Sequence, residues 1–395
     1  MKNIPIFLII GFLLCCNGQD GALASFEANM VIDVDKPITI KYSQLFDTCS
    51  IVPLETDGEH YIGSIDKIIY GKENLVVLDN RMAKAVFIFD RKGKIKAVIN
   101  NQGEGPGEYK FPMNIYMSEN EGKIYIHDSG SAKLLTFSTD AQFLDEFQLK
   151  PEYRMEDFFM KDDRLYFVKT YVENWTEKIG YTNLEFKNFQ PLETYLPGDW
   201  MIRDGGKHKY FYKSDNPEEF IYKDFLNKRI LFFKSDELSE VVSITFNKHF
   251  FEYNKEEKYN GRTIFEKMAR ENLYVLGDNL IDTKNFMLIS VIRGNRGGLA
   301  VWDKSTNSTY LVEKTVNDLD EFYPVLFIPE YNNESGQFTF AVDANEFNRI
   351  KTEKKREEDN PYNSLLSQIS VDNYDNPVLF IYQLKESLDI EKKHH

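Results

Sequence analysis

Two neighbouring residues, His127 and Asp128, are of types that bind metal ions and transfer protons. They end an apolar run that begins at Lys123 and is expected to form a β-strand. Adjacent residues on a strand point to opposite faces, so these two side chains cannot converge on one ion. A similar run earlier in the chain ends in Leu78-Asp79, so the aspartate recurs and the histidine does not. We therefore predict that the aspartate caps the strand end through local backbone hydrogen bonds, and we predict no metal site here.

The segment Gly103-Glu-Gly-Pro-Gly107 superficially resembles a phosphate-binding loop. Such a loop must open a helix whose N–H groups face the anion, whereas here Pro106 lacks a donor and a β segment follows. We predict instead a turn between sheets that needs positive φ and close backbone approach. Glu104 and Glu108 are kept as ligand-contact candidates, because such loops line one mouth of the channel in a ring of sheets.

Two further segments combine aromatic or basic residues with flexible backbone, Asp199-Trp-Met-Ile-Arg203 and Arg293-Gly-Asn-Arg296-Gly-Gly. Tryptophan faces stack on sugar rings, and arginine forks bind carboxylates. The ligand-contact candidates of this kind are Trp175, Trp200, Arg203, Arg293 and Arg296. The alternative is that each is a packing or surface residue. The chain has no HExxH, CxxC pair or GxSxG motif, and we predict no catalytic residue.

A cassette of strand, turn and strand is repeated along the sequence, and it predicts the elements that position these residues. Leu75 and Asp79 of the first copy recur as Ile124 and Asp128, 49 residues later. Within the first copy, Asp90-Arg-Lys-Gly93 predicts a hairpin turn in which glycine takes a positive φ. In the second copy Ala141 replaces that glycine, so the turn differs or the alanine is strained, with relief expected from Asp140.

Weaker copies of the cassette continue along the chain. They begin at Asp163, Asn227, Asn285 and Gly336, which makes six copies in all. Small sheets at this spacing are typical of propeller blades, whereas the alternative, a solenoid, would need polar capping repeats. We therefore predict an all-β, six-bladed β-propeller. Thr263 to Leu273 and Asn345 to Asp359 are expected to be two short helical insertions, either solvated decorations or a lid over one face.

The first residues are read as a targeting segment. Lys2 is followed by an apolar run of eleven residues, Ile4 to Leu14, which is too short to span a bilayer and suits a signal peptide. Leu13-Leu-Cys-Cys16 then resembles a bacterial lipoprotein cleavage box with Cys16 lipidated; ordinary secretion is the alternative. The predicted division is 1–16 signal peptide and lipobox, 17–30 tether and 31–395 propeller.

Composition excludes some partners and favours a β architecture. With 63 acidic against 48 basic residues, the net charge is −15, which repels nucleic acid. Aromatic residues make up 14% and pack well on pleated sheets. If Cys16 carries lipid, Cys49 is the one thiol left in the mature chain, so a large core rather than a disulfide framework must stabilise the fold.

With these features the chain resembles the six-bladed β-propeller lipoproteins of Bacteroidetes, relatives of NHL-repeat propellers. The motifs that carry the resemblance are Ile51-Val-Pro-Leu-Glu-Thr with Ile62-Gly63, the first cassette, Gly103 to Tyr109, and Asp375 to Lys385. The middle of the chain matches in strand pattern alone. The resemblance implies a propeller in the cell envelope and implies little about activity.

The resulting expectation is an outer-membrane lipoprotein on the periplasmic or cell-surface side. It would be a binding or scaffold module for a glycan, a peptide or an envelope protein, touching the membrane through its lipid alone. The alternative is a lyase or hydrolase acting on a polysaccharide or lactone at the channel mouth. The sequence requires no cofactor but leaves room for a divalent cation. Strands near Thr48 to Leu54 and Val378 to Leu384 are predicted to share one blade and close the ring.

Overall fold

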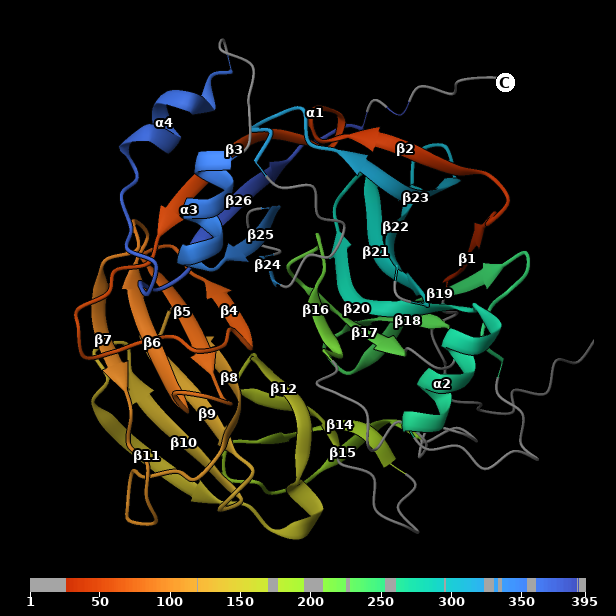
Figure 1. The fold of residues 1–395 in the computed structure, drawn as a ribbon. Coiled ribbons are helices and arrows are strands. Elements are labelled where there is room, and N and C mark those ends of the chain that lie inside the picture. The colour runs from red at the N-terminus through yellow and green to blue at the C-terminus, as the bar shows by residue number, and fades with distance from the viewer. Residues whose placement is uncertain are drawn as a thin grey trace, which may run out of the picture.

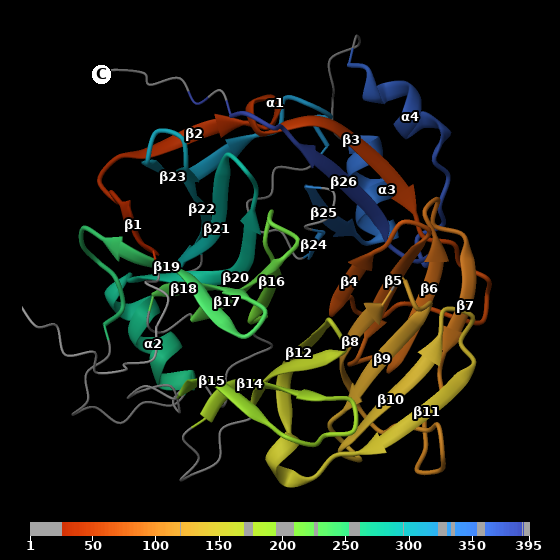
Figure 2. The ribbon, with the colours of Figure 1, turned by 180° about the vertical axis from the view of Figure 1, so that it is seen from behind.

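Six small sheets surround a central axis in the computed structural model (Figures 1 and 2). The structure describes residues 26–118, 120–169, 177–194, 209–224, 228–252, 261–294, 296–322, 330–332, 336–353, 360–388 and 390. The predicted signal peptide, Cys16 and the candidates Trp175, Trp200 and Arg203 lie outside these residues. The predicted all-β, six-bladed propeller is confirmed.

The first three blades each contain four antiparallel strands, taken from the innermost outward. Blade 1 consists of β4 (Lys67–Tyr70), β5 (Asn74–Asp79), β6 (Ala85–Asp90) and β7 (Ile95–Ile99). Blade 2 consists of β8 (Pro112–Ser118), β9 (Lys123–Asp128), β10 (Lys133–Ser138) and β11 (Phe143–Gln148). Blade 3 consists of β12 (Met155–Lys161), β13 (Arg164–Lys169), β14 (Glu177–Asn183) and β15 (Gln190–Thr194).

The other three blades each take an outermost strand from the N-terminal part of the chain. Blade 4 consists of β16 (Phe211–Lys213), β17 (Glu219–Asp224), β18 (Arg229–Lys234), β19 (Glu237–Phe246) and β1 (Phe26–Ile32). Blade 5 consists of β20 (Tyr274–Asp282), β21 (Phe286–Arg293), β22 (Arg296–Asp303), β23 (Ser308–Val316) and β2 (Pro37–Lys41). Blade 6 consists of β24 (Glu330–Asn332), β25 (Gln337–Val342), β26 (Val378–Leu384) and β3 (Phe46–Pro53).

The ring closes through blade 6. Each innermost strand contacts the innermost strand of the next blade, and β24 of the last blade contacts β4 of the first. On the outer side, β3 pairs antiparallel with β26, with Val52 opposite Leu379. The prediction that the two ends of the domain share one blade is therefore confirmed.

The strands β1 and β2 form an outer strap that the sequence analysis did not predict. They pair in parallel with β19 and β23, whereas the other strands of the blades pair antiparallel. Met30 and Ile32 are buried while Val31 between them is half exposed, the alternation of a strand with one covered face. The predicted tether 17–30 is therefore too long, because its residues 26–30 belong to blade 4.

Five of the six predicted cassette copies coincide with the second strand of a blade, and the fourth does not. The copy that begins at Asn227 falls on β18, the third strand of blade 4. The second strand is β17, which ends in Asp224 as β5 and β9 end in Asp79 and Asp128. The aromatic run of β18 imitates a second strand because both strands are buried on both faces.

The helices are short. They are α1 (Tyr42–Leu45), the 3₁₀ turn η1 (Pro151–Tyr153), α2 (Gly261–Glu271), α3 (Ala344–Glu353) and α4 (Tyr362–Gln368). Of these, α3 and α4 pack through Phe347, Ile350 and Leu366 against the core of blade 6. The first predicted insertion is confirmed as α2. In the second, α3 is described to Glu353, and α4 beyond Pro361 was not predicted. No helix within the described residues is long and apolar enough to cross a membrane.

The turns of the two clear cassettes differ as their sequences require. Gly93 has φ +86° and Ala141 has φ +61°, so the alanine occupies a conformation that costs a side chain about 1 kcal/mol. The relief comes from Ser138, whose Oγ accepts hydrogen bonds from the N–H groups of Asp140 and Gln142. The expectation that the Asp140 side chain would supply it was wrong.

Candidate functional site

The central channel contains a cavity of about 620 Å³. Its walls come from β4, β8, β12 and β16, the innermost strands of blades 1 to 4, together with the start of β17. Each innermost strand is a sheet edge, so backbone N–H and C=O groups face the axis as well as side chains. A cavity of this size accommodates a small ligand or one segment of a larger one.

A line of polar contacts crosses the four blades where their innermost strands begin. Lys67 Nζ donates to Asn114 Oδ1 at 2.8 Å, and Asn114 Nδ2 donates to Asp157 Oδ1 at 2.6 Å. Asp157 Oδ2 then accepts the backbone N–H groups of Tyr210 and Phe211 at 2.9 and 3.1 Å. These bonds hold the strands in register around the axis and leave Asp157 engaged on both oxygens.

Lysine and aromatic side chains line the remainder of the cavity. The lysines are Lys67, Lys161, Lys209 and Lys213, and the aromatic residues are Tyr70, Tyr116, Phe158, Phe159, Phe211, Tyr212 and Phe220. Burial lowers the pKa of Lys161, whose Nζ donates to the carbonyl of Pro217 at 2.6 Å. Lys209 lies with its Nζ 5.1 Å from the centre of the Tyr212 ring, a cation–π contact.

A buried lysine stands behind this wall. Lys223 of β17 is 1% exposed, and its Nζ donates to the carbonyl of Gly277 at 2.5 Å. Burial lowers its pKa to about 8. Gly277 lies in a bulge of β20, where residues 277–279 interrupt the pairing with β21. The Tyr212 hydroxyl donates to the carbonyl of Asp278 in the same bulge, so blade 4 holds the bulge in place from the channel side.

The channel carboxylates do not form a metal-binding cluster in the part of the chain that the structure describes. The acidic residues of the cavity are Asp157, Asp162, Asp215 and Glu219. No group of three or more histidine, cysteine or acidic side chains is placed to hold one ion among the described residues.

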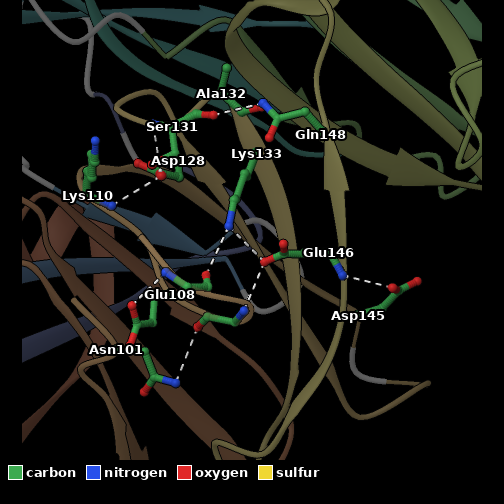
Figure 3. A network of polar contacts seen from close by, with 12 residues as sticks. Asn101, Glu108, Lys110, Asp128, Ser131, Ala132, Lys133, Asp145, Glu146 and Gln148 are labelled. Atoms are coloured by element: carbon green, nitrogen blue, oxygen red, sulfur yellow. Dashed lines mark hydrogen bonds and ion pairs between the residues drawn. The ribbon is translucent and has the colours of Figure 1, made fainter. Parts of the chain in front are cut away.

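The glycine-rich loop joins blades 1 and 2, as predicted, but it lies against the outer strands of blade 2. Lys133 Nζ donates to the carbonyl of Gly105 at 3.1 Å, and Gly107 N–H donates to Glu146 Oε2 at 2.9 Å (Figure 3). Lys133 and Glu146 belong to β10 and β11. The loop is therefore directed away from the central cavity, contrary to the expectation that it lines the channel mouth.

The two glutamates of this loop are engaged within it. Glu104 pairs with Lys110 at 2.6 Å, and Glu108 accepts the Gly105 N–H at 2.7 Å. A Cβ at Gly103 would lie 2.0 Å from the Glu108 carboxylate, so the close approach expected of this glycine is real. Glu104 and Glu108 thus stabilise the loop, and neither lines the central cavity.

Arg293 and Arg296 are brought together, as the last residue of β21 and the first of β22. They line a separate hollow of about 360 Å³ with Asn272 and Glu313. Arg293 lies 4.8 Å from the Tyr274 ring centre and donates to its hydroxyl at 3.1 Å. Arg293 is thus held by its neighbours, and Arg296 is exposed beside it.

The repeated aspartates cap strand ends, as predicted. Asp128 Oδ1 accepts the N–H groups of Phe111 and Gly130. Its Oδ2 accepts those of Lys110 and Ser131 (Figure 3). Two of these bonds hold the loop before the innermost strand, and the other two hold the turn after the second strand, so Asp128 ties the loop to the turn.

Asp79 plays the same part in blade 1. It accepts the N–H groups of Gly63, Ser64 and Met82. Burial acts to raise the pKa of Asp79, but these hydrogen bonds outweigh it and hold the pKa below its usual range.

His127 points to the other side of the strand and is buried beside Phe158, with ring centres 6.4 Å apart. Burial lowers its pKa to about 4. Its Nδ1 has no hydrogen-bond partner among the described residues. It is therefore a neutral core residue.

The sequence analysis missed the residues that line the channel or link its strands. Lys67, Asn114, Asp157 and Lys209 lie on or next to innermost strands, but they are far apart in sequence and fit no motif. Asn114 and Asp157 interrupt the apolar pattern of β8 and β12, and such polar residues could have indicated edge strands. Their convergence depends on the order of the blades around the ring.

The fold and this cavity define a six-bladed β-propeller with a polar and aromatic central channel. The chain belongs to the family described as domain of unknown function DUF4934, whose model matches residues 27–383. This agrees with the resemblance to propellers of Bacteroidetes. No curated protein matches the sequence.

Two solved structures with the same fold come from Bacteroides. A Bacteroides fragilis protein described as exported is 15% identical, with a TM-score of 0.73 over 91% of this chain and 100% of that one. A member of the DUF4221 family from Bacteroides vulgatus is 12% identical, with a TM-score of 0.53 over 86% and 97% of the two chains. At such identities the likeness concerns the fold alone.

Proposed function

We propose that the chain is a lipid-anchored binding or scaffold module of the cell envelope that takes a glycan or peptide of its partner into the central channel. Cys16 would carry the lipid and hold the propeller at the outer membrane, on its periplasmic or outer side. The propeller fold and the exported relative from Bacteroides support a binding module in this compartment.

The observation that carries the proposal is the cavity of about 620 Å³ on the propeller axis. Its wall contains as many lysines as carboxylates, in a chain whose net charge is −15. Asp157 is already engaged by four N–H donors, so an anionic group meets less repulsion here than at the acidic surface. Aromatic side chains beside the lysines offer faces for a sugar ring or an apolar side chain.

The test is to apply the purified protein to glycan and peptide arrays and then to measure the Kd of the best ligand. Lys209→Gln removes a channel charge and should weaken binding of an anionic ligand by roughly tenfold. Lys187→Gln, which removes an exposed charge from the β14–β15 turn, is the matched control and should leave the Kd unchanged. A wild-type protein without any ligand on either array, or equal binding by Lys209→Gln, would overturn the proposal.

A further inference from the structure

A third cavity, of about 350 Å³, lies on the outer side of the ring between blades 4 and 5. It shares no lining residue with the channel. Its lining residues are Ala28, Asn29, Phe232, Glu240, Trp302, Lys304 and Asn307. They belong to β1, β18 and β19 of blade 4 and to β22 with its following turn in blade 5. We propose that this crevice is a binding site for a neutral saccharide unit, independent of the function proposed for the channel.

Trp302 forms a rigid aromatic wall of the crevice. The indole is 7% exposed, and its Nε1 donates to Asn307 Oδ1 at 2.9 Å. The ring is therefore fixed before any ligand arrives, with its polar atom already satisfied. Trp302 and the neighbouring Phe232 are 7% and 3% exposed, so the two aromatic side chains add a small surface to the cavity. Apolar aromatic surface of this kind packs against the C–H groups of a sugar ring.

Glu240 supplies an acceptor that no other residue uses. Its side chain is half-buried, and it accepts no hydrogen bond from a residue within the described ranges. Burial raises its pKa, against the opposing charge of Lys304. A half-buried carboxylate without hydrogen-bond donors costs stability. Hydroxyl groups of a ligand would supply the donors that the Glu240 carboxylate lacks.

Two amides stand near this carboxylate with their donor groups available. Asn29 Oδ1 accepts from the Thr245 hydroxyl, and Asn307 Oδ1 accepts from Trp302. Their Nδ2 groups donate to no side chain or backbone group in the described parts of the chain. A sugar hydroxyl can donate to the Glu240 carboxylate and accept from such an amide at once. The Glu240 acceptor and the two amide donors beside the Trp302 ring therefore match neighbouring hydroxyl groups of a sugar.

The charges of the crevice favour a neutral ligand. Lys304 Nζ is engaged by Asp282 at 2.6 Å and by the carbonyl of Thr283 at 2.7 Å. The positive charge is thus compensated within blade 5, while the Glu240 carboxylate repels an anion. A volume of about 350 Å³ admits one or two sugar rings.

The test uses the full-length protein in detergent and the methyl glycosides of glucose, galactose, mannose and N-acetylglucosamine. We expect saturation-transfer NMR to detect millimolar binding of at least one of them. Glu240→Gln and Asn307→Gly should each raise the Kd by roughly tenfold. Asn307 has φ +53°, a conformation that glycine adopts freely, so this variant does not strain the turn; it removes the amide donor together with the acceptor of Trp302 Nε1.

Two controls separate this site from folding and from the channel. Glu237→Gln changes an exposed glutamate on the same strand, and Lys209→Gln changes the channel; neither should alter the Kd of the glycoside. Melting temperatures should show that all four variants are folded. No binding of the four glycosides to the wild type, or unchanged binding by both Glu240→Gln and Asn307→Gly, overturns the proposal.

Discussion

Phe380, near the C-terminal end of the domain, lies opposite Ile51 in the antiparallel pair of β26 and β3. This pairing joins segments that are more than 300 residues apart and completes the last blade. Val378, Leu379 and Phe380 are each at most 1% exposed, so β26 contributes to the core on both of its faces.

Deletion of residues 376–395 is therefore expected to abolish cooperative unfolding or to lower the melting temperature sharply. Each large buried side chain of β26 is worth about 1.5–3 kcal/mol, and the sum is comparable with the whole stability of a domain. Thermal denaturation followed by circular dichroism measures the effect. Deletion of residues 391–395 is the control and should leave the melting temperature unchanged. An unaltered melting temperature in the longer deletion would show that closure does not stabilise the ring.

Protonation of His127 is expected to destabilise the protein. Its pKa falls from 6.5 to about 4 on folding because the ring is buried. The unfolded chain therefore binds a proton below pH 6.5 that the folded protein does not bind until about pH 4. Above about pH 6.5 this residue does not lower the free energy of unfolding. As the pH falls from 6.5 to 4, proton binding by the unfolded chain lowers the free energy of unfolding by on the order of 3 kcal/mol.

Urea unfolding at a series of pH values checks this dependence. His127→Phe should flatten the stability curve between pH 6.5 and 4. The matched control is His249→Asn, because His249 is exposed and asparagine tolerates its φ of +58°. An equal slope in the wild type and His127→Phe would contradict the assignment.

The capping aspartates give a third prediction. Asp128→Ala leaves four backbone N–H groups without their acceptor at a fully buried position. We expect a loss of about 3 kcal/mol in the free energy of unfolding. Asp140→Ala, at an exposed hairpin turn in the same blade, should change it by less than about 0.5 kcal/mol. A similar loss of unfolding free energy in the two variants would contradict the capping role of the strand-end aspartate.

These aspartates illustrate which structural features can be predicted from local sequence. The strand β5 could be predicted because Leu75 to Leu78 form a continuous apolar run with a polar residue at each end. The cap could be predicted because adjacent strand residues face opposite sides. Ring closure followed from matching strands at the two ends and from the cost of exposed sheet edges.

The strap and the channel could not be predicted in this way. The strand β1 pairs in parallel with β19, more than 200 residues away, and its short alternating pattern does not identify a partner. Lys67 and Asp157 are linked through Asn114 because blades 1 to 3 are adjacent in the ring, a relationship that no spacing encodes. Trp302 meets Phe232 and Glu240 in the crevice because blades 4 and 5 are adjacent, which the sequence spacing does not show either.

The buried lysine behind the channel should give stability a dependence on alkaline pH. Burial lowers the pKa of Lys223 from 10.5 to about 8, so between these values the unfolded chain holds a proton that the folded protein has released. Stability should therefore rise with pH from about 8 to 10.5 through this group. Lys223→Met keeps the length of the side chain and should remove that rise in urea unfolding. Lys187→Met, on an exposed turn, should retain it, and a rise that persists in Lys223→Met would exclude Lys223 as its source.

Lipid attachment at Cys16 is the prediction on which the envelope location depends. A small residue must precede the cleavage site. Cys15 meets this requirement if Cys16 is lipidated, whereas Leu14 would occupy that position if Cys15 were lipidated. Cells grown with an alkyne analogue of palmitate should label the wild type and Cys15→Ser, but not Cys16→Ser. The unlabelled variant should leave the membrane fraction, because one lost thioether removes the anchor while the propeller is unchanged. Equal labelling of Cys16→Ser would assign the lipid elsewhere, and no labelling of the wild type would favour ordinary secretion.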